Sequence, residues 1–215
     1  MEGAKDLIKD HLPHIFLAIM FSVGIAGHLI SPLYSLMITL TPYTLLLTGI
    51  TVLYNYRNEL RRDLIIWFMT VFVCTFFLEV IGVKTGLIFG KYEYTTILGF
   101  SIFSVPLIIG FNWAIIILGS VIIAGMITKR CIAASLIAAL IALSFDFLLE
   151  PIAIKLSYWQ WENNNVPIQN YVAWFSIAFF SSISYFNTVE KVNNKLASFY
   201  LFVQFIFFLT LNLFL

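Results

Sequence analysis

Long apolar runs separated by short polar stretches are the dominant pattern of this chain. Each run is close to the ~20 residues that a helix needs to cross a bilayer. We read seven of them, at residues 14–30, 34–54, 64–82, 102–127, 131–150, 170–186 and 196–215. Hydrophobic residues make up 61% of the 215 positions and charged residues only 11%, which is not the composition of a soluble domain. The sequence predicts an all-α, polytopic integral membrane protein, with residues 1–215 as a single transmembrane helical domain.

Basic residues fall mainly on one side of the seven predicted spans. The N-terminal tail has two, and the connections after the second, fourth and sixth spans have three, two and two, which is nine of the twelve. The other three are Lys84, Lys91 and Lys155. Because cytoplasmic loops carry the excess of Lys and Arg, we expect a multi-pass protein of the cell membrane with a cytoplasmic N-terminus. The long connections at 83–101 and 151–169 then lie on the outer side.

Two carboxyls close the apolar run at residues 131–150. Asp146 and Glu150 are four residues apart, a spacing that puts both on one face of a helix. A carboxylate in hydrocarbon costs ~2.5–3.5 kcal/mol on insertion scales, so the pair indicates a polar interior cavity or a protonated acid. Pro151 is expected to end the helix or kink it, whereas Pro106 is expected in the first turns of its own helix. The plainer alternative is a helix-end pair that reaches interfacial water.

Other ionisable groups fall at the same predicted depth as this pair. Glu79 lies near the outer end of the third run and His28 near the end of the first. We therefore expect one site that gathers these groups in the outer leaflet. Both cysteines lie inside apolar runs and read as buried residues, and the histidines lack metal-ligand spacing. The formal net charge of +1 suggests no nucleic-acid partner.

The two outer connections and the helices beside them carry a distinctive series of residues. Residues 79–94 read E-V-I-G-V-K-T-G-L-I-F-G-K-Y-E-Y, and residues 146–153 read D-F-L-L-E-P-I-A. V-P at 105–106, N-W at 112–113, W-Q-W at 159–161, V-P at 166–167, Asn170 and Trp174 complete the series. In combination it resembles the carotenoid-biosynthesis membrane family that contains the carotenoid 1,2-hydratases, including bisanhydrobacterioruberin hydratase, over roughly residues 75–175. The chain departs from the family pattern at Ser157-Tyr158, where a glycine is expected.

The resemblance implies an enzyme that adds water to the terminal C1=C2 double bond of an acyclic carotenoid end group, without a redox cofactor. Asp146 or Glu150 would donate the proton, because burial favours the neutral form of a carboxyl, and Glu79 would position the water. Aromatic faces would stabilise the cation. Candidate substrate-binding residues are His28, Tyr94, Asn112, Trp113, Trp159, Trp161, Asn170 and Trp174. Helix packing is an equal alternative for Trp113 and Trp174, as is an interhelical hydrogen bond for Asn112.

Three other functions remain open at the level of sequence. A membrane lycopene cyclase would form the same cation and trap it with an internal double bond. An intramembrane prenyltransferase would use the Asp146 and Glu150 pair on Mg²⁺ and diphosphate, but we find no second acidic motif, so no metal and no other cofactor is expected. A proton-coupled transporter also uses intramembrane carboxylates, although we find no internal repeat. The expected partners are a carotenoid, the lipid bilayer and other enzymes of a carotenoid pathway.

Overall fold

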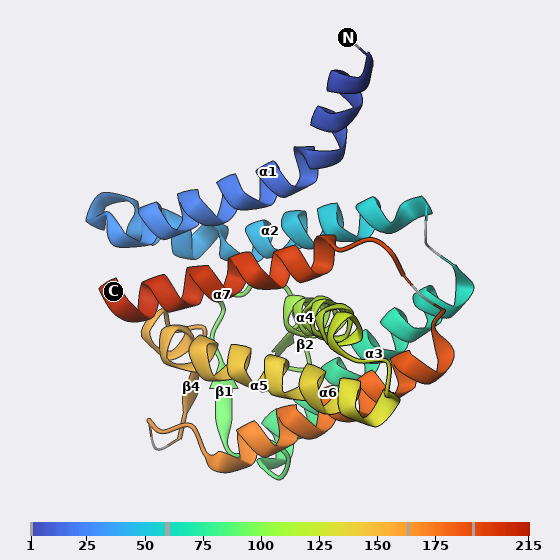
Figure 1. Cartoon of the computed structure of the whole chain (residues 1–215). Coiled ribbons are helices and arrows are strands. Elements are labelled where there is room, and N and C mark those ends of the chain that lie inside the picture. Colours follow the sequence, from blue (N-terminus) through green and yellow to red (C-terminus); the bar gives the residue numbers. More distant parts are fainter. Residues whose placement is uncertain (1, 59–60, 163, 191) are drawn as a thin grey trace.

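The apolar runs of the sequence fold as long helices (Figure 1). The computed structural model describes residues 2–58, 61–162, 164–190 and 192–215, with side chains for residues 11–57, 61–162, 164–190 and 192–215. The described residues form seven α-helices and one short 3-10 helix. The α-helices are α1 (Glu2–Leu29), α2 (Ser31–Asn55), α3 (Arg62–Thr85), α4 (Leu107–Ile127), α5 (Cys131–Lys155), α6 (Ile168–Thr188) and α7 (Leu196–Phe214). The 3-10 helix, η1 (Tyr56–Asn58), follows α2.

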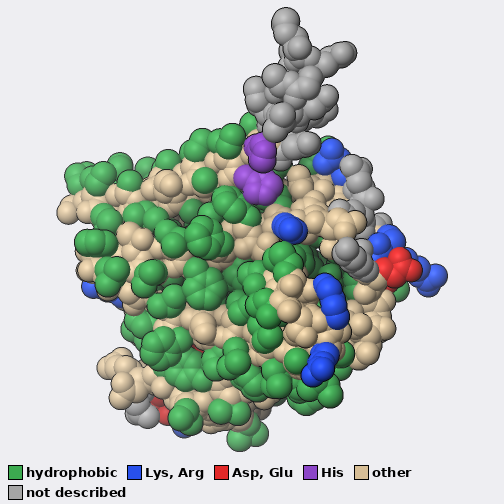
Figure 2. Space-filling model, viewed as in Figure 1, with side chains coloured by type: hydrophobic (Ala, Val, Ile, Leu, Met, Phe, Trp, Pro, Cys, Tyr) green, Lys and Arg blue, Asp and Glu red, His purple; other side chains and the backbone are tan. Residues whose placement is uncertain are grey.

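Six of these helices are long and apolar enough to cross a membrane, and α6 falls below that limit. Large apolar side chains also cover much of the surface (Figure 2), as they do where a protein meets lipid. The chain is therefore an all-helical, multi-pass membrane protein. The seventh span and the cytoplasmic N-terminus stay predictions.

The helix α4 forms the centre of the bundle. It packs against α2, α3, α5, α6 and α7, and Figure 1 shows it between the other helices. Its residues are apolar on nearly every face, which is the pattern of a buried helix. Gly119 allows a close approach, because a Cβ there would lie 2.5 Å from the backbone oxygen of Ala197 on α7.

The predicted start of this helix at residue 102 is wrong. Two short strands, β2 (Ser101–Ile102) and β3 (Val105–Pro106), form a hairpin there, and α4 begins at Leu107. The two residues of the turn, Phe103 and Ser104, have positive φ angles of 52° and 67°, as this kind of hairpin requires. A residue before proline avoids the helical region, so Val105 stays extended and Pro106 precedes the helix.

The predicted end of the fifth helix at Glu150 is also wrong. The helix α5 runs on through Pro151 to Lys155. A proline removes only one backbone donor, and neighbouring segments can support the helix around it. Here the turn after Pro151 is closed by bonds from Leu156 N to Ile152 O and from Tyr158 N to Ala153 O, both 2.8 Å.

The two long connections, predicted as loops, each contain a strand. The strands β1 (Tyr92–Tyr94) and β4 (Trp159–Trp161) pair in antiparallel fashion. Tyr94 and Trp159 lie opposite each other although 64 residues lie between them in the sequence. The structure thus joins the two connections at one end of the bundle, beside the ends of α3 and α5 (Figure 1).

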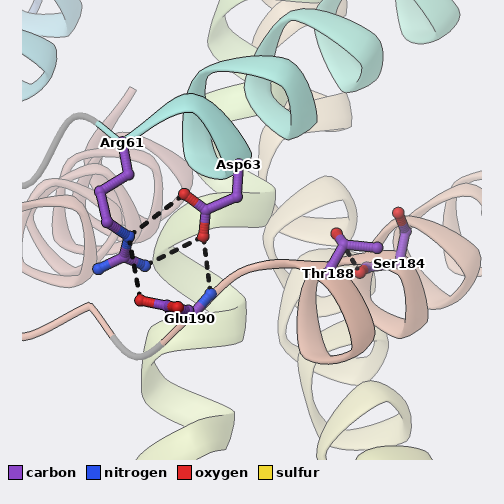
Figure 3. Close-up of polar contacts among 5 residues, drawn as sticks. All are labelled: Arg61, Asp63, Ser184, Thr188 and Glu190. Atoms are coloured by element: carbon purple, nitrogen blue, oxygen red, sulfur yellow. Dashed lines mark hydrogen bonds and ion pairs between the residues drawn. The ribbon is translucent and has the colours of Figure 1, made fainter.

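The opposite end of the bundle carries most of the basic side chains seen in Figure 2. There Arg61 lies 3.1 Å from Asp63 and 3.5 Å from Glu190, while the backbone N–H of Glu190 donates to Asp63 at 2.8 Å (Figure 3). These contacts hold the segment after α6 against the start of α3. Three of the nine basic residues on the predicted cytoplasmic side, Lys5, Lys9 and Lys191, have side chains outside the described residues.

Candidate active site

A cavity of about 90 Å³ lies among the helices at the end where β1 and β4 pair. That is well above the ~10–15 Å³ needed for one water molecule. All the residues that the sequence singled out line this cavity. They are His28, Glu79, Tyr94, Asn112, Trp113, Asp146, Glu150, Trp159, Trp161, Asn170 and Trp174. The structure therefore brings residues from α1, α3, α4, α5, α6 and the two strands into one space.

The paired strands supply the hydrogen-bond donors of the cavity. Tyr92 lies opposite Trp161, Glu93 opposite Gln160, and Tyr94 opposite Trp159. Because side chains alternate along a strand, the two tyrosines and two tryptophans share one face. That face lines the cavity, whereas Glu93 and Gln160 are exposed on the other.

Glu79 receives both tyrosine hydroxyls. The O–H groups of Tyr92 and Tyr94 donate to its Oε2, the second at 2.8 Å. Glu79 itself is only 3% exposed. Burial, followed by the negative charge of Glu79, raises the pKa of Tyr92 and of Tyr94 well above the usual range. Both phenols therefore keep their protons and act as donors.

Glu150 and Asp146 share a donor but differ in the number of donors. The indole N–H groups of Trp159 and Trp161 donate to Glu150 Oε2 at 3.0 and 2.9 Å. Asn170 Nδ2 donates to Glu150 Oε1 at 3.1 Å and to Asp146 Oδ2 at 2.9 Å. Within the described part of the chain, Glu150 thus has three donors and Asp146 has one.

The charge of the cavity is not balanced by a permanent cation. Glu79, Asp146 and Glu150 are buried close enough to repel one another. Among the described residues, no Lys or Arg lines the cavity. Three ionised carboxylates in so apolar a space would be very costly, so the group must hold at least one proton.

The tryptophans of α4 and α6 pack on each other. Trp113 and Trp174 stack with ring centroids 3.6 Å apart and an interplanar angle of 14°. Trp174 also stacks on Phe89, at 5.3 Å. Because Trp174 already shares ring faces with two neighbours, the geometry favours the packing alternative for this residue.

Asn112 and His28 lie on the part of the wall that α1, α4 and α7 form. Asn112 Oδ1 accepts from Tyr200 O–H at 2.8 Å and from Gln204 Nε2 at 3.1 Å. The interhelical hydrogen bond weighed for Asn112 is therefore present. His28 Nδ1 lies 2.7 Å from the backbone oxygen of Gly24, one turn earlier on α1.

Sequence reasoning missed several residues of the wall. Tyr92 sits two positions before Tyr94, so the alternation of a strand could have found it. Tyr158 pairs with Thr41 of α2 at 3.0 Å, and no sequence signal links the two. Gln204 is a lone amide in an otherwise apolar run, which is the signal that was available.

A metal site is not evident in the described residues, where no group of three or more His, Cys, Asp and Glu side chains could hold an ion. The donors around the carboxyls are the hydroxyl, indole and amide groups named above. The expectation that no metal is needed stays a prediction.

Comparison with known proteins adds the family. The family model for carotenoid biosynthesis proteins matches residues 40–215. The chain belongs to this family. The resemblance seen in the sequence is thereby confirmed. No curated protein and no solved structure matches the chain.

The carotenoid biosynthesis motif after Glu79 has a structural reason at most of its positions. A Cβ at Gly82 would overlap the ring of Phe89, which folds back over α3. Gly86 ends α3 with a φ of 67°, a left-handed conformation that glycine adopts without strain. The turn aims the chain so that Tyr92 and Tyr94 return to Glu79. The motif thus builds one carboxyl and its two donors.

Proposed function

We propose that this carotenoid biosynthesis protein is a hydratase that adds water to the terminal C1=C2 double bond of an acyclic carotenoid end group. The observation that carries the proposal is the group of three buried carboxyls with unequal donors in one cavity. Hydration of an alkene needs a neutral acid, a stabilised cation and a bound water, and the cavity has candidates for each.

Asp146 is the proton donor in this proposal. Hydrogen bonds from neutral donors favour the ionised form of a carboxyl, and in the described part of the chain Glu150 has three donors where Asp146 has one. The shared proton of the group therefore resides best on Asp146. Asp146 transfers it to C2, and Glu150, one helical turn away, returns a proton from water.

The cation that forms at C1 is tertiary and needs a wall that does not react with it. Trp159 and Trp161 hold their N–H groups on Glu150, so their rings lie beside the acids. Each aromatic face can stabilise a desolvated cation by ~2 kcal/mol. Glu79, held by two phenols, completes the site and positions a water beside the acids.

Product mass tests the proposal against cyclisation. The chain would be produced in a bacterial host that makes an acyclic hydrocarbon carotene, with the Asp146→Asn variant as the inactive reference. Hydration adds the mass of one water molecule per modified end, whereas a cyclase leaves the mass unchanged. A product of unchanged mass that has gained a ring would replace the hydratase by the lycopene cyclase.

A further inference from the structure

Two buried polar atoms in the cavity wall have no hydrogen-bond partner among the described residues. They are Nε2 of His28 and Oε1 of Gln204. His28 is 4% exposed and Gln204 0% exposed, and both side chains line the cavity. Buried polar atoms in folded proteins almost always have a hydrogen-bond partner. Two such atoms without one in the same cavity therefore indicate a bound molecule that supplies the missing hydrogen bonds.

The hydrogen bonds of His28 fix what its free nitrogen requires. The Gly24 carbonyl can only accept, so Nδ1 of His28 carries the hydrogen of this 2.7 Å contact. In the neutral ring the other nitrogen, Nε2, is then an acceptor. It requires a donor from the cavity.

The amide of Gln204 also leaves an acceptor that requires a donor from the cavity. Its Nε2 donates to Asn112 Oδ1, whose other donor is Tyr200 O–H. This network turns the carbonyl side of the Gln204 amide away from Asn112. The atom left over, Oε1, is again an acceptor without a donor.

The two side chains lie along the contact between α1 and α7. The ring of His28 packs on Phe207, with centroids 5.6 Å apart, and Gln204 precedes Phe207 by nearly one turn of α7. The acids lie on α3 and α5 instead. The cavity therefore has an acidic wall and, on other helices, a wall of two acceptors.

We infer that His28 and Gln204 bind the water that attacks the carotenoid cation, an inference that rests on the proposed hydratase function. A water molecule offers two O–H donors and so matches acceptors, whereas a hydrocarbon end group offers none. The bound water then keeps a lone pair free for C1.

The step balances without any further reagent. Asp146 gives its proton to C2, and the C1=C2 π pair forms the new C–H bond. The water oxygen forms the C–O bond with C1, and the oxonium releases one proton to His28 Nε2. That proton returns through water to the carboxylate, so one alkene and one water become one tertiary alcohol.

Hydration in D₂O separates protonation of the alkene from capture of water. The variants are His28→Phe and Gln204→Met, which remove the acceptors and keep the bulk. His14→Phe on the same helix and Gln160→Met on the exposed face of β4 are the matched controls. The substrate is a hydrocarbon carotene, so it brings no O–H donor of its own. Two quantities are read by mass spectrometry: the hydrated product, and deuterium in the recovered carotene.

The two variants should hydrate about 100-fold more slowly, because the water is no longer positioned. They should still exchange deuterium into the recovered carotene, since Asp146 is intact and the cation loses a proton when no water traps it. Controls should hydrate like the wild type. Thermal unfolding of each variant checks that it is folded, and either variant decides the question by itself if the other does not fold.

Other outcomes would overturn the inference. Variants that hydrate as well as the wild type, or that lose exchange and hydration together while folded, would remove the water site and leave the hydratase standing. Variants that fail only on a carotene with a hydroxylated end would assign the two acceptors to a substrate hydroxyl. A wild type that never adds water would remove the proposed function and the water site together.

Discussion

The three buried carboxyls differ in how they are held, and this difference assigns their roles. Glu79 accepts from two phenols, Glu150 from two indoles and an amide, and Asp146 only from the Asn170 amide among the described residues. A donor stabilises an ionised acceptor more than a neutral one. Replacing Asp146 by a residue that cannot give up a proton should accordingly reduce the rate of hydration most.

Replacing Asp146 by asparagine should abolish hydration and leave the protein folded. The amide has nearly the same shape and carries no acidic proton, and it needs no charge compensation in the cavity. Glu150→Gln should also lower the rate, though less, because water can take over part of its role. Product formation from an acyclic carotene, at matched membrane expression, measures both.

Glu93→Gln is the control for this pair, because Glu93 lies on the exposed face of β1, away from the cavity. It should leave the rate unchanged, since exposed substitutions usually stay within about 0.5 kcal/mol. Full activity in both the Asp146 and Glu150 variants would remove the α5 acids from the mechanism and leave Glu79 as the acid to examine.

Sequence alone located the acids and could not rank them. Asp146, Glu150 and Glu79 stand out because charges are costly in apolar runs. Their donors lie elsewhere in the chain: Tyr94 is 15 residues from Glu79, and Asn170 is 24 residues from Asp146. No local pattern tells which donor reaches which carboxyl, so the ranking required the fold.

Ser157 stands where the family pattern has a glycine, and the backbone conformation at this position explains why glycine is expected. It has a φ of 58°, in the left-handed region that glycine favours, at the turn between α5 and β4. A non-glycine residue there costs roughly 1–2 kcal/mol, partly offset by the greater freedom of glycine in the unfolded chain. The glycine expected from the family would fit this turn without strain.

Ser157→Gly should therefore leave the protein at least as stable as the wild type. Ser144→Gly, the same change in the middle of α5, should lower the free energy of unfolding by about 0.5 kcal/mol. Thermal unfolding in detergent micelles compares them. If the two variants lose equal stability, the turn is not strained at Ser157.

At the scale of elements, the β1–β4 ribbon is what turns two loops into a site. The period of two is visible in Y-E-Y and W-Q-W, yet the strands were predicted as loops because three residues carry little signal alone. Two helix ends were predicted wrongly because a proline alone does not say whether a helix ends. At Pro106 the preceding chain is extended and the helix starts after the proline, whereas at Pro151 packing sustains the helix through it.

Removing an indole donor from the ribbon should destabilise the protein through Glu150. Trp161→Phe keeps an aromatic ring and deletes the N–H that lies 2.9 Å from Oε2. Loss of a donor to a buried acceptor costs about 1–3 kcal/mol. Thermal unfolding should show this loss, and Gln160→Ala, between the two tryptophans on the exposed face, should show almost none.

The loss of stability caused by Trp161→Phe should be smaller when residue 150 is a neutral glutamine. In a Glu150→Gln background the amide oxygen needs the indole less than a carboxylate does, so Trp161→Phe should cost less there than in the wild type. Equal costs in the two backgrounds would mean that the indole only packs, and that its hydrogen bond adds nothing to the ionised acid.

At the scale of the whole molecule, the two ends of the bundle are chemically different. One end holds the ribbon and the cavity, and the other holds Arg57, Arg61, Lys129 and Lys195 beside the helix connections. The ion pair of Arg61 with Glu190 brings the end of α6 to this basic end (Figure 3). The helix α6 starts beside the ribbon and ends at the basic end, so it must run the length of the bundle.

This path predicts that α6 crosses the membrane although its composition alone does not reach the limit. Its 21 residues span ~30 Å at 1.5 Å per residue, the thickness of the hydrocarbon core. Two of the polar residues that lower its hydropathy are buried: Asn170 donates to the acids, and Ser182 donates to Ala178 O on its own helix. The helix can therefore lie in lipid without an exposed polar group at those positions.

Labelling of single cysteines from each side of the membrane tests this topology. In a chain without Cys74 and Cys131, cysteines would be introduced at the exposed positions Lys129, Glu162 and Lys195. If α5 and α6 both cross, an impermeant maleimide should reach positions 129 and 195 from the same side and position 162 from the other. The excess of basic residues further predicts that the shared side is the cytoplasm. Labelling of 162 and 195 from one side would mean that α6 does not cross, and the count of seven spans would then be wrong.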